Sequence, residues 1–584
     1  MTILRYCGSA LAGFFTLAAA AHLYGAGAKT PFATLEAEAG QLAGGAKVHA
    51  FVPGSPVPKT ATLELEASGN AYVRLQHAGD SISWTNPVAG ANAIVVRSSL
   101  PDTPSGGGMT ATLNLYVDGK FRQALSLSSR QSWVYRTKDA GWIDDPTQGG
   151  MPFKFYNEDH AFIAGSPLVK GSILMLKMDA DDTAPEYDID CIDLEPVAQP
   201  LPRPLRSLSI ADFGAVPNSD QDCQKAIQDC VDAARKQNRS VWIPTGTWKT
   251  SSIVPHGLDF TGVTVHGAGM WYATLYRQAP ISGSTAPPAR QWSSRLQIGS
   301  HTTVTDFSID SNSVRRALGK PEGGDYGVLT QGESWLVQRI WVRHCDANWC
   351  SGTDGMIRDC RVADSWGDGI NLNNGNSPNP THLGIRLTAE NNFVRGTGDD
   401  GLATYSDRGS SGKNGQMTGT QILNNTAVAP YWANCLRVAG GRNVVVRGNL
   451  LLDSASNSGM TVGVFGKTGQ PLESAIIEDN EIHHGGGWNG ADRHGLVIGS
   501  AEHEYTDVIV RNNIIYDSLR AGIFVGPRFD RITLQGNRVI HPATTGIEIG
   551  KNVTGQGEFH DNNITGLNPG QAPIKNDSPA TFKF

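Results

Sequence analysis

The sequence predicts an all-β protein with two domains, a β-sandwich followed by a solenoid of stacked β-coils. In the second half of the chain, asparagine recurs every 24–33 residues, each time with an apolar residue two positions later. Repeats of this length, rich in Val, Ile, Asn and Gly, are typical of β-solenoids. Residues 31–197 instead contain short alternating segments, and a proline-rich segment at 198–207 separates the two parts. The ladder asparagines are Asn392, Asn425, Asn449, Asn480, Asn513, Asn537 and Asn562.

The first 28 residues are predicted to be a secretory signal peptide. Arg5 supplies the positive charge, residues 10–21 form a short apolar core, and Ala26-Gly27-Ala28 offers a small-residue cleavage site. The apolar core is too short for a membrane anchor. We therefore expect a secreted protein, extracellular or periplasmic, that does not span a membrane. The net charge of -7 argues against a nucleic-acid partner. We expect the protein to be a monomer.

Residues 31–197 are predicted to form the sandwich, because Ala111, Leu113, Leu115 and Val117 alternate before an Asp118-Gly119 turn. The opening Thr34-Leu35-Glu36-Ala37-Glu38-Ala39 and the closing segment 187–194 resemble the ends of carbohydrate-binding modules of families 35 and 6. This resemblance implies glycan binding and a structural calcium held by Glu36, Glu38 and Asp193, and carboxylate oxygens suit that ion. The alternative is an ordinary charge pattern on an edge strand.

The second domain is expected over 208–584, after the stiff linker at 198–207. It opens with Asp212-Phe213-Gly214-Ala215, a helix expected from Asp220 to Lys236 with Ser219 as N-cap, and a strand at 241–248. This opening resembles the start of pectin-lyase-like right-handed parallel β-helices, in which the helix covers one end of the solenoid. Cys223 and Cys230 are too far apart along such a helix to form a disulfide and should be buried, while Cys345 and Cys350 are close enough in sequence to pair.

Three aspartates are the predicted catalytic residues. Asp368 lies eight residues after Cys360, which takes the ladder position in its coil, and Asp400 lies eight residues after Asn392. The two carboxylates therefore fall at equivalent points of neighbouring coils, and Asp399 adds a third. Clustered carboxylates suit glycoside hydrolysis, which needs one protonated and one ionised group. The alternative is that these aspartates sit in solvated turns, where Asp-Gly is common.

The helix-strand opening, Trp366-Gly367-Asp368-Gly369-Ile370 and Gly398-Asp399-Asp400-Gly401 resemble glycoside hydrolase family 87, which contains α-1,3-glucanases and mycodextranases. The resemblance spans about 207–566. It implies a right-handed β-helix, an α-glucan substrate, inversion of configuration and no catalytic cofactor. It also implies that Asp399 is the acid and that Asp368 and Asp400 hold the attacking water. Asp346 is a candidate fourth carboxylate.

Side chains near the aspartates favour a neutral sugar. An acidic polysaccharide would need several cations, whereas Arg437 is the nearby cation in a predicted strand. For each aromatic side chain the alternative role is core packing. The two main alternative functions are hydrolysis of an acidic polysaccharide, as in polygalacturonases, and glycan binding by a β-helix without catalysis. A lyase is a third possibility, but it would need a basic residue, and the segments 365–374 and 396–401 contain no Lys or Arg. The predicted sugar-binding residues are Trp349, Trp366, Asn373, Tyr405, Trp432, Arg437 and Trp488.

Overall fold

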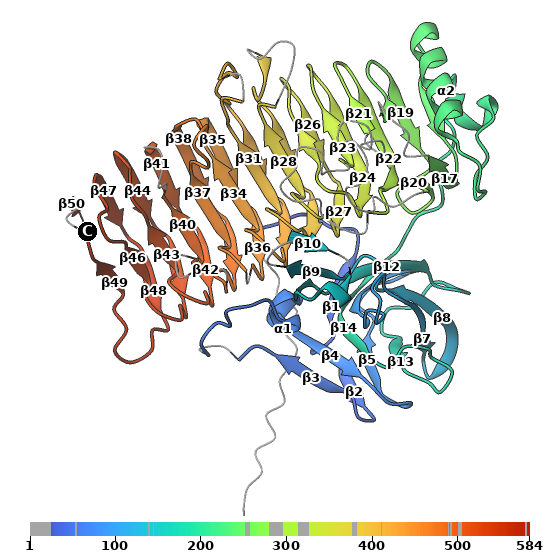
Figure 1. Ribbon diagram of the computed structural model, residues 1–584, viewed down its shortest axis with the longest axis horizontal. Coiled ribbons are helices and arrows are strands. Elements are labelled where there is room, and N and C mark those ends of the chain that lie inside the picture. Colours follow the sequence, from blue (N-terminus) through green and yellow to red (C-terminus); the bar gives the residue numbers. More distant parts are fainter. Residues whose placement is uncertain are drawn as a thin grey trace, which may run out of the picture.

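The computed structural model describes residues 25–583 apart from 53–54, 138–140, 144, 251–256, 279–295, 314–325, 376–381, 410–411, 455, 489, 491–492, 500–504 and 579–580. The predicted signal peptide lies, up to residue 24, outside the described residues. A β-sandwich packs below the middle coils of a long β-helix (Figure 1). No helix among the described residues is long and apolar enough to cross a membrane.

The sandwich consists of two antiparallel sheets and a small third sheet. The alternation at 111–117 is confirmed, since Ala111, Leu113, Leu115 and Val117 are all buried, and the Asp118-Gly119 turn joins a hairpin. One sheet contains β12 (Asn157–Phe162), β6 (Ala93–Ser99), β14 (Tyr187–Glu195), β4 (Ala71–Leu75) and β3 (Lys47–Ala50), with β1 (Ala33–Glu36) on β14. The second contains β2 (Gln41–Ala43), β5 (Ser81–Thr85), β13 (Ile173–Lys177), β7 (Thr110–Val117) and β8 (Lys120–Ser128). The third contains β10 (Gly141–Ile143), β9 (Val134–Thr137) and β11 (Met151–Lys154), and the helical turns are α1 (Leu63–Glu66), η1 (Ser68–Asn70) and η2 (Pro146–Gln148).

The second domain is a parallel β-helix, as predicted. One of its sheets contains, in order, β18 (Leu258–Asp259), β21 (Leu296–Ile298), β23 (Val328–Thr330), β25 (Trp349–Cys350), β28 (Ile370–Asn373), β31 (Leu402–Tyr405), β34 (Leu436–Ala439), β37 (Met460–Gly463), β40 (Leu496–Ile498), β43 (Ile523–Val525), β46 (Ile547–Ile549) and β49 (Ile574–Asn576).

The other sheet contains two strands from most coils. Its first half is β15 (Leu208–Ser209), β16 (Val241–Ile243), β17 (Gly246–Thr250), β19 (Thr264–Gly267), β20 (Ala273–Arg277), β22 (Thr303–Asp310), β24 (Leu336–Arg343), β26 (Met356–Arg358), β27 (Arg361–Ala363), β29 (Thr388–Glu390), β30 (Phe393–Arg395) and β32 (Gln421–Leu423). Its second half is β33 (Thr426–Val428), β35 (Gly441–Arg447), β36 (Leu450–Leu452), β38 (Leu472–Glu478), β39 (Glu481–His483), β41 (Tyr505–Arg511), β42 (Ile514–Tyr516), β44 (Arg531–Gln535), β45 (Arg538–Ile540), β47 (Gln556–His560), β48 (Asn563–Thr565) and β50 (Thr581–Lys583).

The asparagine ladder runs through the interior of the helix as a continuous chain of side-chain hydrogen bonds. The carboxamide of Asn392 donates to Oδ1 of Asn425 (2.9 Å), and Asn425 donates in turn to Oδ1 of Asn449 (3.0 Å). Each of these amides also donates to a main-chain carbonyl of the preceding coil, such as Ile357 O for Asn392. Buried polar groups are costly unless they are bonded. The ladder therefore fixes the register of the coils.

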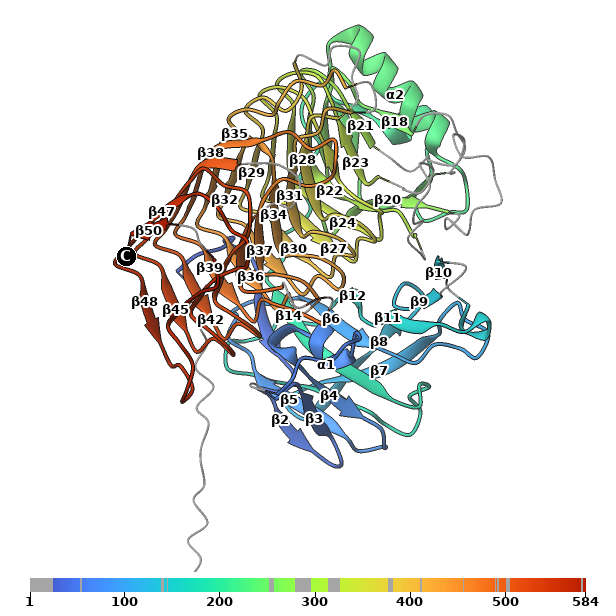
Figure 2. The same ribbon diagram turned by 60° about the vertical axis from the view of Figure 1, so that its left-hand side comes forward.

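Helix α2 (Gln224–Gln237) covers the first coils of the β-helix (Figures 1 and 2). It begins later than predicted, because Cys223 is its N-cap and Ser219 instead accepts a hydrogen bond from Gln221 in the preceding turn. Cys223 and Cys230 are buried, as expected. The predicted pairing of Cys345 with Cys350 is wrong, since the described cysteines are all free and buried. A 3-10 helix, η3 (Ile210–Phe213), precedes α2.

Buried ion pairs join the sandwich to the β-helix. Arg395 of β30 binds Glu158 of β12 and lies 2.7 Å from the carboxylate of Asp193 on β14. Arg361 of β27 binds the same two carboxylates at 3.1 and 2.5 Å, and all four side chains are almost fully buried. Lys154 of β11 binds Asp364 at 3.0 Å. The linker is also fixed, since the amide of Leu201 donates to Ala268 O (3.0 Å). The two domains therefore form one packed unit.

Candidate active site

The structure brings Asp368, Asp399 and Asp400 together at the start of β28 and β31. One oxygen from each carboxylate lies within 4.8 Å of the other two. Ile370 of β28 pairs with Leu402 of β31, so Asp368 and Asp400 occupy equivalent positions in neighbouring coils. Asp346 occupies the equivalent position one coil earlier, where its carbonyl accepts from the amide of Gly367, and its carboxylate is not part of the cluster of three.

Glycines allow the two aspartate-bearing turns to stack closely. The amide of Gly398 donates to Ser365 O (2.8 Å), and that of Asp399 donates to Gly367 O (3.0 Å). A Cβ atom at position 398 would lie 2.1 Å from the carbonyl oxygen of Trp366. No side chain fits at that distance, so Gly398 is required for the approach that brings the carboxylates together.

Asp400 is the buried member of the cluster and is held on both oxygens. Its Oδ1 accepts from the main-chain amide and the side-chain amide of Asn434, at 3.0 and 2.6 Å, and its Oδ2 accepts from Nε of Arg437 at 2.8 Å. Burial and the neighbouring charge of Asp399 raise the pKa of Asp400, while Arg437 and Asn434 oppose the rise. The donors surrounding it favour the ionised form, which they bind directly.

Asp368 and Asp399 are partly exposed and lie nearer the surface. Oδ2 of Asp368 accepts from the side-chain amide of Asn371 at 2.8 Å, and Oδ1 of Asp399 accepts from the amide of Asp400 at 3.2 Å. The cluster therefore combines one buried carboxylate fixed by three N–H donors with two accessible ones. An arrangement of this kind can hold a water molecule and a proton donor side by side.

Of the predicted sugar-binding residues, Arg437, Tyr405 and Trp349 lie on the strands around the aspartates. Arg437 binds Asp400 directly, Tyr405 ends β31, and Trp349 begins β25 beside β28. Asn373 is not available to a sugar, because it is buried and its amide donates to Asn371. The amides that touch the cluster are those of Asn371 and Asn434.

Of the predicted tryptophans, Trp366 is buried inside the protein, and Trp432 and Trp488 are half-buried at the contact with the sandwich. Trp366 is 0% exposed and donates to Ser313 O, so the prediction that it binds sugar is wrong. Trp432 and Trp488 pack against Phe153 of the sandwich, with ring centroids 4.8 and 5.7 Å apart. These rings form the apolar contact between the sandwich and the aspartate-bearing coils. Their spacing in the sequence gave no sign of this role, since Phe153 lies far away in the chain.

Asp193 does not join Glu36 and Glu38, which corrects the predicted calcium set. Its carboxylate is held by Arg361, Arg395 and the hydroxyl of Thr34. Glu36 instead lies within reach of Asp190 and Cys191, and it accepts from Ser68 at 2.7 Å. Two guanidinium groups leave no place for a cation at Asp193, and a thiol is a poor calcium ligand. The three predicted residues therefore do not fit that ion as a set.

Two glutamates of the sandwich, Glu38 and Glu66, should make the folded protein more stable at pH 5 than at pH 9. Burial raises the pKa of Glu38 to about 8 and that of Glu66 to about 7. In the unfolded chain both groups ionise near their ordinary value of about 4.3. The folded protein therefore binds more protons between these values, and its stability falls as the pH rises through that range. Thermal unfolding followed across pH 5 to 9 measures the fall.

Glu38→Gln should flatten this pH dependence, whereas Asp561→Asn, at an exposed carboxylate, should leave it unchanged. A melting temperature that stays constant over this range would contradict the prediction. A fall on adding EDTA at pH 8 that calcium reverses would show that a cation, rather than protons, neutralises the carboxylates around Glu38.

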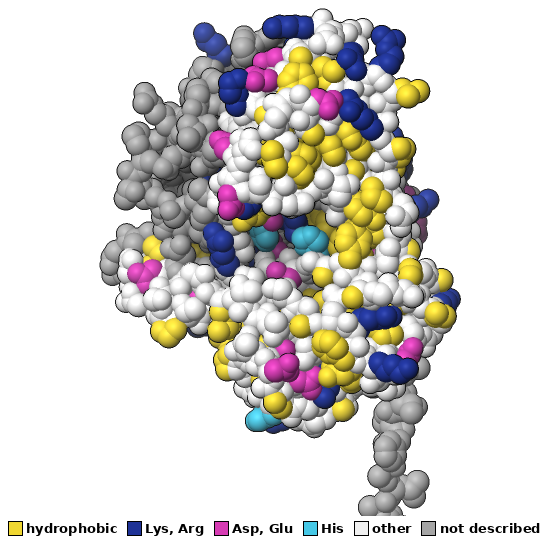
Figure 3. All heavy atoms as spheres, turned by 90° about the vertical axis from the view of Figure 1, so that its right-hand side faces the viewer, with side chains coloured by type: hydrophobic (Ala, Val, Ile, Leu, Met, Phe, Trp, Pro, Cys, Tyr) yellow, Lys and Arg dark blue, Asp and Glu magenta, His cyan; other side chains and the backbone are white. Residues whose placement is uncertain are grey.

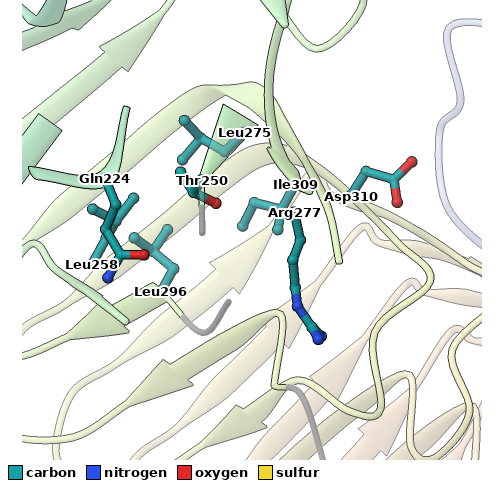
Figure 4. A pocket seen from close by; sticks show the side chains of 8 residues that line it. All are labelled: Gln224, Thr250, Leu258, Leu275, Arg277, Leu296, Ile309 and Asp310. Carbon is teal, nitrogen blue, oxygen red and sulfur yellow. The ribbon is translucent and has the colours of Figure 1, made fainter. Parts of the chain in front are cut away.

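A small pocket lies near α2, away from the aspartates (Figure 4). The space-filling view of that end of the molecule shows acidic and basic side chains interspersed (Figure 3). The pocket contains none of the predicted site residues. It is lined by Gln224, Thr250, Leu258, Leu275, Arg277, Leu296, Ile309 and Asp310.

Comparison with known proteins identifies related catalytic domains. A family model described as α-1,3-glucanase catalytic domain D1 matches residues 29–197, and one described as α-1,3-glucanase catalytic domain D2 matches 218–474. A third, described as a right-handed β-helix region, matches 431–582. No curated protein matches the chain significantly.

Solved structures show the same fold along nearly the whole chain. The Agl-KA catalytic domain is 22% identical, with a TM-score of 0.83, over 96% of this chain and 98% of that one. The catalytic unit of a thermostable GH87 α-1,3-glucanase from Streptomyces thermodiastaticus strain HF3-3 is 24% identical, with a TM-score of 0.75, over 96% and 97%. The catalytic domain of a GH87 α-1,3-glucanase in complex with nigerose is 21% identical, with a TM-score of 0.75, over 96% and 99%.

Carboxylates clustered on the flank of a right-handed β-helix define this protein as a glycoside hydrolase. Between residues 29 and 582 the two catalytic-domain models leave 198–217 and 475–582 unmatched, and the second of these ranges matches the β-helix model. The chain belongs to the α-1,3-glucanase family, glycoside hydrolase family 87.

Proposed function

We propose that this glucanase is secreted and cleaves neutral α-1,3-glucan with inversion, using Asp399 as the acid and Asp368 and Asp400 to hold the attacking water. The convergence of the three carboxylates within 4.8 Å carries the proposal. Complexes of GH87 α-1,3-glucanase catalytic domains with nigerose and with tetrasaccharides support an α-1,3-linked substrate. We further propose that the protein acts as a monomer and needs no cofactor for catalysis.

Hydrogen bonding supports these roles. Asp400 accepts from three N–H donors, which stabilise its charge and leave a lone pair to accept from water. Asp368 accepts from Asn371 and is partly exposed, so we place the same water against its carboxylate. Asp399 is partly exposed, so its carboxyl group can reach a glycosidic oxygen in the cleft. A proton on Asp399 can pass to the glycosidic oxygen as the bond breaks.

The separation of the carboxylates does not by itself assign the stereochemistry. Their closest oxygens lie within 4.8 Å, below the roughly 6.5–9.5 Å of a usual inverting pair and the roughly 5–5.5 Å of a retaining pair. Inversion is supported instead by the restraint on Asp400. Asn434 and Arg437 fix both of its oxygens, so this carboxylate is poorly placed to swing toward carbon as a nucleophile.

The two other functions have weaker support. In a polygalacturonase-like cleft the cations must bind sugar carboxylates, but Nε of Arg437 is already bound to Asp400. A protein that only binds glycan would not need three carboxylates in contact, and placing them together costs electrostatic free energy. The neutral α-glucan is therefore the substrate that fits the described residues around the site.

NMR of the first-formed product tests both substrate and mechanism. Incubation with soluble α-1,3-linked oligosaccharides should release the β-anomer first, because water attacks from the face opposite the leaving group. Dextran oligosaccharides and polygalacturonate, assayed in parallel, should release little. An initial α-anomer would reject inversion, and faster cleavage of polygalacturonate would reject the neutral substrate.

A further inference from the structure

Phe465 is an exposed aromatic side chain in the loop between β37 and β38. Its side chain is 54% exposed, and among the described residues after Val216 it is the only large apolar side chain so exposed. Isolated exposed apolar residues are common, but an exposed aromatic ring next to a site that binds polymer is a candidate contact for that polymer.

The loop presents this ring in a fixed position. The guanidinium carbon of Arg437 lies 5.0 Å from the ring centroid, and the ring of Tyr405 lies 6.2 Å away in an edge-on arrangement. The loop is tied back to the end of β31, where both Tyr405 and Thr468 donate to Oδ2 of Asp407, at 2.8 and 2.5 Å. The ring is therefore held in place by neighbouring side chains while one part of it faces solvent.

Phe465 is separated from the catalytic cluster by a single side chain. Arg437, which contacts the ring, donates to Asp400 at 2.8 Å. The strand order β25, β28, β31, β34 and β37 places the loop of Phe465 on one side of the two aspartate-bearing coils. Trp349 on β25 lies on the other side, and the ring of Tyr326 is 6.1 Å from it. Aromatic rings thus flank the carboxylates along the axis of the solenoid.

We propose that Phe465 is the platform of a glucosyl-binding subsite on the β37 side of the aspartates, with Trp349 on the β25 side, so that the glucan lies along the solenoid axis. The inference rests on the proposed function. Trp349 lies on β25, and the ring of Phe465 rests on Arg437 of β34, which is three strand spacings away, roughly 14 Å. Only a substrate of several sugar units can span that distance. Neutral sugars present apolar C–H faces that pack on aromatic rings, and the polar groups beside the rings fix their orientation.

The test compares Phe465→Ala with Phe465→Trp and with Phe121→Ala on a series of α-1,3-linked oligosaccharides of increasing length. Phe121 is a matched control, since it is 58% exposed on the sandwich and also lies edge-on to a tyrosine, Tyr116. Phe465→Ala should lower kcat/KM about 10-fold for long chains, chiefly through KM, and should change it little for the shortest cleaved chain. Phe465→Trp should retain the length dependence.

A loss that is equal at every chain length would overturn the subsite, because the ring would then act through Arg437 on Asp400. The same kinetics for Phe465→Ala and Phe121→Ala would overturn it as well. If the unaltered chain cleaves none of the series, the proposed function fails and the subsite fails with it. If the unaltered chain cleaves the series and the two alanine variants agree, only the subsite fails.

Discussion

Replacing Asp399 by Asn should lower kcat by at least about 100-fold, the usual scale for the loss of a general acid, while the protein remains folded. The side chain is partly exposed and its amide analogue is isosteric, so little stability depends on its charge. Asp368→Asn and Asp400→Asn should reduce the rate similarly, because each removes a group that holds the water. Steady-state rates on soluble oligosaccharide, with thermal unfolding as the check of folding, measure these effects.

Asp346→Asn is the matched control for these variants. Asp346 sits at the equivalent position one coil earlier, outside the cluster of three, and we expect near-normal activity after its replacement. Near-normal activity in Asp399→Asn together with loss in Asp346→Asn would transfer the acid role to Asp346. The two variants thus separate a role in the cluster from a general effect of removing a charge.

The repeated part of the fold could be predicted because its cause is local and periodic. The ladder asparagines must bond to each other coil by coil, so their spacing records the length of each coil. The same register predicts that Asp368 lies opposite Asp400, and the pairing of β28 with β31 confirms it. A solenoid is unusual in this respect, since contacts between neighbouring coils follow directly from positions in the sequence.

Contacts between the domains could not be predicted, because they join residues that share no repeat. The sequence contained no sign that Arg395 would bind Glu158 and Asp193, or that Phe153 would cover Trp432. This is also why Asp193 was wrongly placed in the calcium set and Trp366 among the sugar-binding residues. A tryptophan at a turn and a carboxylate in an alternating strand look exposed until the partner domain covers them.

Phe465 was missed for a different reason. Its neighbours Gly463, Val464 and Gly466 suggest a turn, and a single phenylalanine in a turn gives no functional signal by itself. Its significance comes from Arg437 beneath it, which lies in another coil and is itself bound to Asp400. Residues of this kind become visible only when the coils are stacked.

Deleting the sandwich, residues 29–197, should abolish activity on soluble oligosaccharides and on insoluble glucan alike. The domain covers Tyr431, Trp432 and Trp488, which lie beside the aspartate-bearing turns, and its Lys154 binds Asp364, four residues before Asp368. The truncated chain would expose these aromatic side chains, which favours aggregation. Activity on both kinds of substrate, with sedimentation to measure solubility, checks the prediction. A greater loss on insoluble glucan than on oligosaccharides would show instead that the sandwich is a glycan-binding module.

Arg395→Ala tests the same coupling in the full-length chain. It leaves Glu158 and Asp193 buried with Arg361 as their remaining guanidinium partner, and breaking a buried ion pair in this way costs about 3–5 kcal/mol. Arg442→Ala is the control, because it removes a comparable but exposed pair with Glu473, worth about 0–1 kcal/mol. Denaturant unfolding should therefore show a large loss of stability for the first variant and a small one for the second. Equal losses would mean that the buried network around Arg395 contributes no more than a surface pair, and that other contacts hold the sandwich to the β-helix.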